Sequence, residues 1–333
     1  MTDEHGPTQT PDRGKRLSRK EALAILEEQA GGTERLFESP MSQWRLAIRR
    51  FRERKSGMLG LGIVVFLIIV AILAPLLAPY EPNQVLIGQE DIGPRDPPCI
   101  HILGCDPDTP QHILGVDGNV RDEFSRLIFG TRVSLTLGFF TVTLALLVGS
   151  AIGAIAGYKG GWLDNILMRF MDVILGFPSL LLAIAIVMVL GRGLQNALLA
   201  IAVVTMPQYA RVMRAQVLAI KESDFVAASR ALWATPRRIF LRRVVPNALT
   251  PIVVLATLGV ATAILEAAGL SFLGLGAQPP TAEWGTMLAQ ERNNVFTSPH
   301  LVFFPGLAIM ITVLGFNLMG DGLRDALDPT LNK

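Results

Sequence analysis

Long uncharged apolar runs alternate with polar segments along this chain of 333 residues. Six of the runs can each supply about 20 helical residues, the length needed to cross a hydrocarbon core of about 30 Å. The runs lack the strict alternation of barrel strands, so helices, which satisfy their own backbone hydrogen bonds, are the expected form. We therefore predict transmembrane helices at residues 58–79, 133–157, 173–191, 193–212, 246–268 and 301–320.

This pattern predicts an all-α integral membrane protein, and the charges between the spans predict its orientation. Basic residues near the ends of spans resist translocation. Arginines crowd segments 41–57 and 213–245, which are therefore expected to be cytoplasmic, whereas segment 80–132 is mostly acidic and should be extracytoplasmic. With six spans, the connection 269–300 is also extracytoplasmic. Both termini are then cytoplasmic, with polar tails at 1–40 and 321–333.

The segment just before the first span has a two-sided helical pattern. Met41, Trp44, Ile48 and Phe51 recur at helical spacing, with arginines between them. Such a helix lies in the membrane interface, with its apolar side toward the lipid bilayer. We expect an interfacial elbow helix over 41–57. The capping pattern of Ser18 and Glu21 in the tail indicates only a short solvated helix.

Composition supports a membrane protein and gives no sign of nucleic-acid binding. Half of the residues are hydrophobic, the mean hydropathy is +0.43, and the formal net charge is only +2. The first apolar run begins too far along the chain to read as a cleaved signal peptide, so it is expected to stay as a span.

A search for catalytic chemistry is negative. His5, His101, His112 and His300 all lie outside the predicted spans, and the chain contains neither HExxH nor the GxxxxGK[ST] phosphate loop. We therefore predict no catalytic residue, no cofactor and no metal site. Any ATP hydrolysis must occur in separate partner subunits.

The two cysteines, Cys99 and Cys105, fall in the predicted extracytoplasmic loop. In an oxidising compartment a disulfide between them is favoured over two free thiols, although closeness in sequence does not guarantee the required Cα separation. A metal site that also used His101 and His112 is disfavoured, because the spacing does not match a standard zinc site.

One acidic residue, Glu266, adjoins a long apolar run at the end of the fifth span. An ionisable group there is a candidate for the transport pathway. The alternative, that Glu266 sits at the outer interface, has equal weight on the sequence alone.

The segment between the fourth and fifth spans has the signals of two short helices. Ser223 can cap a helix from Asp224 to about Trp233, and Thr235 and Pro236 can start a second helix that ends before Pro246. Phe225, Ala228 and Leu232 share one face of the first helix, and Arg237, Arg238, Arg242 and Arg243 cluster on the second. A knob of this kind suits a groove on another protein. The alternative, a basic loop held against lipid headgroups, explains the arginines but not two capped helices.

The same segment resembles a known family. Residues 224–235 read DFVAASRALWAT and residues 242–247 read RRVVPN, which is similar to the EAA loop of bacterial ABC importer permeases. Further matches point to the C-type permease of the dipeptide and oligopeptide (nickel) family; they are His112–Asp117, Arg121–Asp122, Ser125–Gly130, Gly157–Trp162, Phe177–Ser179, Leu270–Gly276, Gln278–Pro280 and Gly320–Pro329. The resemblance covers about residues 41 to 329 and omits only the tail and an insertion near Cys99.

This resemblance implies the type I ABC importer permease fold and a place in a bacterial plasma (inner) membrane complex. The implied partners are a homologous permease subunit, two ATP-binding subunits and an extracytoplasmic solute-binding protein. The implied ATPase-coupling residues are Asp224, Phe225, Ala228, Arg230, Leu232, Trp233, Arg237 and Pro246.

The chain departs from the family at several positions in this segment. The family usually has Glu-Ala-Ala where this chain has Ala227, Ala228 and Ser229, and often His in place of Arg243. The family also has Gly where this chain has Trp233. A glycine there ends a helix in the left-handed conformation, so we expect a differently built turn.

Peptide import is the leading function. The alternatives are nickel import and a non-transporting scaffold or receptor that recruits a soluble protein.

Overall fold

The computed structural model describes residues 43–327 and divides the chain into two units, Met1–Arg49 and Arg50–Lys333. The predicted polar tail 1–40, with His5, Ser18 and Glu21, and the final residues 328–333 lie outside the described residues. A helix, α2 (Gln43–Glu53), forms within the predicted elbow segment. Its placement against a membrane stays a prediction.

The second unit is built from helices, and the described residues contain no strand beyond two isolated bridges. The longer helices are α3 (Lys55–Leu77), α4 (Glu123–Lys159), α5 (Gly161–Leu175), α6 (Ser179–Leu190), α7 (Leu194–Lys221), α10 (Val245–Phe272) and α12 (His300–Leu327). The shorter elements are η1 (His101–Leu103), α8 (Asp224–Ala231), α9 (Pro236–Ile239), the π-helical η2 (Phe240–Val244), α11 (Trp284–Glu291) and η3 (Arg292–Asn294). The prediction of an all-α fold is confirmed for the described part of the chain.

Four helical stretches are long and apolar enough to cross a membrane: Lys55–Leu77, Glu123–Lys159, Pro236–Phe272 and His300–Leu327. A fifth arises if α5 and α6 form one broken span. The count of six spans is thus not confirmed. The predicted span that has no counterpart among these stretches is the fourth. The helix α7 covers it but carries the polar residues Gln195, Asn196 and Gln208 within it.

The helices of the structure differ from two of the predicted boundaries. The third predicted span, 173–191, is not one helix: α5 ends at Leu175, and α6 begins at Ser179 after a bend of 94°. Pro178 explains the break, since it has no N–H to donate and disfavours helical backbone in the residue before it. The helix over the second predicted span, α4, begins at Glu123, ten residues before residue 133, so part of the predicted loop 80–132 is helical. Where the membrane span itself begins stays a prediction. Asp122 caps this start by accepting a hydrogen bond from the Ser125 N–H at 2.7 Å.

Close packing of α4 on α7 forms the centre of the unit. Gly149, Gly153 and Gly157 of α4 face the backbone carbonyls of Met206, Ala210 and Arg214 of α7. Both sets advance by four residues in the same direction, so the two helices run parallel. A Cβ at Gly153 would collide with the Ala210 carbonyl, so the crossing depends on glycine there.

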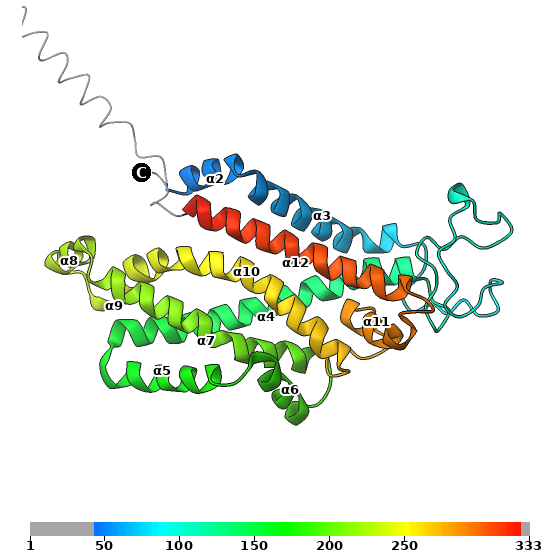
Figure 1. Cartoon of the computed structure of the whole chain (residues 1–333). Helices are drawn as coiled ribbons and strands as arrows, with labels where there is room; N and C mark the ends of the chain where they lie inside the picture. Colours follow the sequence, from blue (N-terminus) through cyan, green and yellow to red (C-terminus); the bar gives the residue numbers. More distant parts are fainter. Residues whose placement is uncertain (1–42, 328–333) are drawn as a thin grey trace, which may run out of the picture. The chain divides into compact units, whose positions relative to one another are not determined.

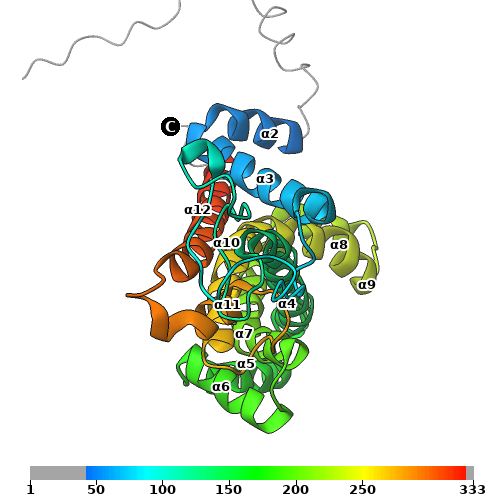
Figure 2. The same ribbon diagram turned by 90° about the vertical axis from the view of Figure 1, so that its right-hand side faces the viewer.

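The remaining helices surround this pair. In the end-on view α3 lies toward one edge and α6 toward the opposite edge, with α4, α7 and α10 between them (Figure 2). The α8–α9 segment lies at one end of the long helices, and the loop 78–122 lies at the other end (Figure 1). Buried Ile201, Met213, Ile252, Ile264 and Phe316 come from α7, α10 and α12 and form part of one continuous core.

Candidate functional site

The candidate site is the projection formed by α8, the following turn and α9, residues 223–239, here called the knob. Ser223 occupies the N-cap of α8 but makes no side-chain cap; its hydroxyl instead donates to the Ile220 carbonyl at 2.6 Å. The prediction that Ser223 caps α8 is therefore wrong, because a nearer acceptor in the last turn of α7 takes its hydroxyl. Thr235 does cap α9, by accepting from the Arg238 N–H at 3.4 Å.

The turn after α8 keeps the left-handed conformation although it has no glycine. Trp233 has φ of 56°. Its N–H donates to the Arg230 carbonyl at 3.0 Å, and the Ala234 N–H donates to the Ser229 carbonyl at 3.2 Å. These two bonds make a Schellman helix end. The expectation of a differently built turn is wrong, because the paired bonds hold Trp233 in a conformation that costs a non-glycine residue roughly 1–2 kcal/mol.

The knob presents large apolar side chains to its surroundings. Trp233 is 94% exposed, Leu232 82% and Phe225 45%. The other residues of the implied coupling set, Asp224, Ala228, Arg230 and Arg237, are also exposed. The structure thus gathers seven of the eight residues on one projection, and the described chain leaves Trp233 and Leu232 almost uncovered.

The base of the knob is held firmly. Val226, Ile239 and Val244 are buried, and the Tyr158 hydroxyl donates to the Pro236 carbonyl at 2.9 Å. The Tyr158 ring also packs on Phe240, with 4.7 Å between centroids. Sequence reasoning missed these anchors, and the only signal for Tyr158 was its place in the Gly157–Trp162 motif. The end of α4 therefore supports α9 directly.

Pro246, the eighth residue of the set, lies beyond the knob. The prediction that a helix ends before Pro246 is wrong, because the helical path continues from Pro236 to Phe272. Pro246 cannot donate a backbone hydrogen bond, and its ring crowds the preceding turn. The π-helical turn η2 accommodates it: the Val245 N–H donates to the Phe240 carbonyl, five residues back.

Glu266 lies near the far end of α10 and is half-buried. Its carboxyl group faces Ser179, the first residue of α6. The carboxyl oxygen Oε2 is buried without a partner in the described residues. Glu266 thus lies where α10 approaches the start of α6, beside the 94° bend.

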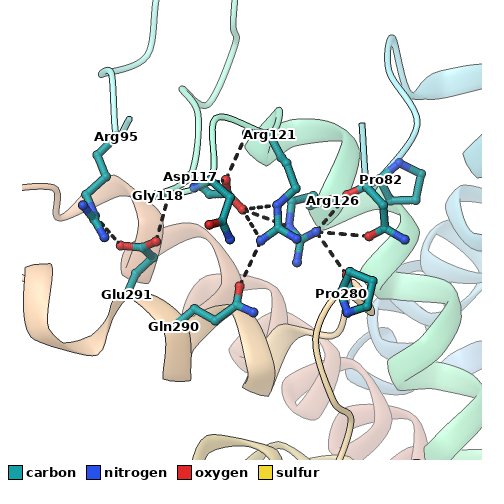
Figure 3. A network of polar contacts seen from close by, with 11 residues as sticks. Pro82, Arg95, Asp117, Gly118, Arg121, Arg126, Pro280, Gln290 and Glu291 are labelled. Carbon is teal, nitrogen blue, oxygen red and sulfur yellow. Dashed lines mark hydrogen bonds and ion pairs between the residues drawn. The ribbon is translucent and has the colours of Figure 1, made fainter. Parts of the chain in front are cut away.

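The loop end of the unit carries a buried network of charges (Figure 3). Asp117 accepts hydrogen bonds from Arg121 at 2.7 Å and lies 3.5 Å from Arg126. Arg121 also donates to Gln290 of α11 at 3.2 Å. Glu291 accepts from the Arg95 side chain at 2.7 Å and from the Gly118 N–H at 3.0 Å. The network ties the loop 78–122 and the first turns of α4 to α11.

His112 lies in the same loop and is buried between two carboxylates. Its ring nitrogens lie 2.8 Å from Asp122 and 3.0 Å from Glu90, and the ring stacks on Tyr80. Burial lowers the pKa of His112, but the hydrogen bonds to Asp122 and Glu90 outweigh it and hold the pKa above 6.5. Burial and the bond to Glu90 raise the pKa of Tyr80 to about 12. Elsewhere in the loop Cys99 and Cys105 form a disulfide, with their Cα atoms 5.4 Å apart.

Comparison with known families gives two matches that together cover most of the chain. Residues 149–333, more than half of the chain, match the family described as "Binding-protein-dependent transport system inner membrane component". Residues 42–98 match the "N-terminal TM domain of oligopeptide transport permease C".

Individual proteins show the same relationship. The chain is 45% identical over 291 residues to the dipeptide transport system permease protein DppC of Alkalihalophilus pseudofirmus, covering 87% of this chain and 91% of that one. It is 43% identical over 289 residues to the glutathione transport system permease protein GsiD of Escherichia coli O6:K15:H31, covering 86% and 91%. A structure of the inward-facing MetNI methionine ABC transporter has a similar fold, with a TM-score of 0.51 and 21% identity, over 61% of this chain and 96% of that chain.

Members of this family work with ATP-binding subunits, a partner permease and a solute-binding protein. The apolar helices, the exposed knob and the two family matches agree. The chain belongs to the binding-protein-dependent transport system inner membrane components and is a multi-pass permease subunit of an ABC importer, with ATP hydrolysis in separate subunits.

Proposed function

We propose that this permease forms half of the translocation path for short peptides and pairs with one homologous permease. Of two ATP-binding subunits, one docks on the cytoplasmic knob of this chain and the other on the partner permease, and an extracytoplasmic solute-binding protein delivers the peptide. The peptide class rests on the relatives named for dipeptide and glutathione transport.

The observation that carries the coupling role is the exposed apolar group of Trp233, Leu232 and Phe225 on a firmly anchored knob. Large apolar side chains in water favour burial in a partner, and tryptophan is enriched among the residues that dominate binding energy. The surrounding arginines favour an acidic rim around the partner's groove.

Motion can pass from the knob to the membrane helices through its anchors. Val226 and Ile239 are buried, and Tyr158 connects α9 to α4. Closure of the ATP-binding subunits would therefore shift α4 and α10 together with the knob. Glu266 lies where α10 meets the start of α6, and we assign it to the peptide pathway at that junction.

Reconstitution tests the proposal. The chain is co-expressed with the neighbouring partner genes, purified as a complex and placed in proteoliposomes that contain ATP inside, with the solute-binding protein added outside. We expect ATP-dependent uptake of a labelled dipeptide and none with a non-hydrolysable ATP analogue. Uptake of ⁶³Ni²⁺ in place of the dipeptide would support the nickel alternative. A stable complex without uptake of either substrate would support the scaffold alternative.

A further inference from the structure

A groove on the exposed surface between α3 and α4 has a single charged residue at its edge. The groove has a volume of about 340 Å³, within the range of ligand sites, about 300–1,000 Å³. Ile68, Ala71 and Ile72 of α3 line one side, and Leu135 and Phe139 of α4 line the other. No acidic side chain contributes to the lining.

The charged residue is Arg132 of α4. Its side chain is exposed, and no ion pair or side-chain hydrogen bond joins it to the described residues. Thr136, the one other polar side chain in the groove, donates its hydroxyl to the Arg132 carbonyl at 2.7 Å and is thereby satisfied. An unpaired arginine on a lipid-facing helix is costly, by about 2.5 kcal/mol or more near the middle of a span, unless an anion or water reaches it.

The direction of α4 decides where the guanidinium can reach. Arg132 lies nine residues after Glu123, the first residue of α4, which places its Cα about 14 Å along the helix at 1.5 Å per residue. Side chains on a helix lean toward its N-terminus. A long arginine side chain therefore extends toward the loop end of α4, where the bilayer surface lies, while the apolar groove continues toward the bilayer centre.

From this arrangement we infer that Arg132 and the α3–α4 groove bind one phospholipid of the leaflet at the loop end. The guanidinium pairs with the lipid phosphate in charge-assisted hydrogen bonds, and an acyl chain lies along Ala71, Leu135 and Phe139. A cation at the surface end of an apolar groove is complementary to a phosphate joined to a hydrocarbon chain. The inference rests on membership of the permease family and not on the transported substrate.

Lipid retention by the purified complex tests this site. The full-length chain is purified with its partner permease and ATP-binding subunits, and native mass spectrometry measures binding of added dioleoyl phosphatidylglycerol or phosphatidylethanolamine. Dioleoylglycerol, which lacks the phosphate, serves as the comparison lipid. We expect retention of the phospholipids and not of dioleoylglycerol. Arg132→Leu should weaken phospholipid binding about tenfold, the range expected for lost charge-assisted bonds.

Matched variants separate loss of the site from loss of folding. Ala71→Phe fills the groove and should weaken binding while Arg132 is kept, whereas Ile69→Phe adds bulk to an exposed α3 position that does not line the groove and should have no effect. Arg192→Leu removes an exposed cation elsewhere and should also have no effect. Equal retention by wild type and Arg132→Leu would overturn the inference. A photo-crosslinker at Ile72 that captures the partner permease and no lipid would also overturn it, because a protein then covers the groove.

Discussion

Trp233 shows how one side chain can have opposite effects on folding and on binding. As a non-glycine residue with φ of 56° it strains the end of α8, while its ring is almost fully exposed. Glycine at this position relieves the strain, and alanine does not. Trp233→Gly and Trp233→Ala therefore both remove the indole ring, but only the glycine variant also relieves the backbone strain.

We expect Trp233→Ala and Trp233→Gly to weaken association with the ATP-binding subunits by similar factors, about tenfold or more if the ring is an interface anchor. Membrane insertion should be intact in both, and the glycine variant should gain roughly 1 kcal/mol in turn stability. Co-purification of the ATP-binding subunits and coupled uptake are the measurements. Wild-type yield and uptake in both variants would remove Trp233 from the docking surface.

His112 makes the loop sensitive to pH. A histidine whose pKa is raised by folding stabilises the fold fully below its ordinary pKa of 6.5, and this contribution is lost as pH rises through the raised value. Asp122, Glu90 and Tyr80 are the titratable groups that face it.

We expect amide hydrogen exchange in residues 80–122 to show less protection as pH rises above 6.5, after correction for intrinsic exchange rates. His112→Gln should abolish this dependence, because glutamine does not titrate. A pH dependence that is the same in His112→Gln and in wild type would assign the effect to other groups.

At the scale of single elements, close helix packing places the strictest demands on the sequence. Gly153 of α4 contacts the α7 backbone, whereas Gly62 of α3 faces open space. The same chemical change at these two glycines therefore has different consequences.

We expect Gly153→Ala to destabilise the protein by about 1–3 kcal/mol, as overpacking does. Gly62→Ala should be neutral or slightly stabilising, since alanine favours helix. Thermal unfolding in detergent, followed by fluorescence-detected gel filtration, compares the two. A Gly153→Ala variant as stable as Gly62→Ala would show that the α4–α7 crossing can shift.

For the whole molecule, the buried charges at the loop end connect distant parts of the chain. Arg121 pairs with Asp117 in a buried site and reaches Gln290, which is 169 residues away in the chain. Removing Arg121 would leave the buried Asp117 with only the more distant Arg126, at 3.5 Å, as a charged partner.

Arg121→Leu should therefore destabilise the protein by up to about 3 kcal/mol, the low end of the loss for a broken buried pair, because Arg126 still compensates part of the Asp117 charge. Arg95→Leu should cost less than Arg121→Leu, because Arg95 is itself partly exposed and the buried Glu291 keeps its hydrogen bond from the Gly118 N–H. Thermal unfolding and limited proteolysis of loop 78–122 measure both variants. Equal effects of the two substitutions would contradict the view that burial sets the importance of this network.

The sequence alone determined the helical class, the apolar stretches, the knob and the family resemblance. Apolar runs and capping residues act locally, so their signals can be read along the chain, and the Thr235 cap and the exposed Phe225 and Leu232 belong to this group. The exposed knob required no knowledge of distant contacts.

Only the tertiary structure decided how these parts bend and meet. The 94° bend before α6, the continuous helix through Pro246 and the left-handed Trp233 each depend on a competition between local preference and surrounding bonds. The burial of Asp117 and Arg121 depends on α11, far along the chain. Loop charges and single glycines look alike in a sequence, and only their neighbours in space distinguish a buried pair or a helix crossing from solvated surface.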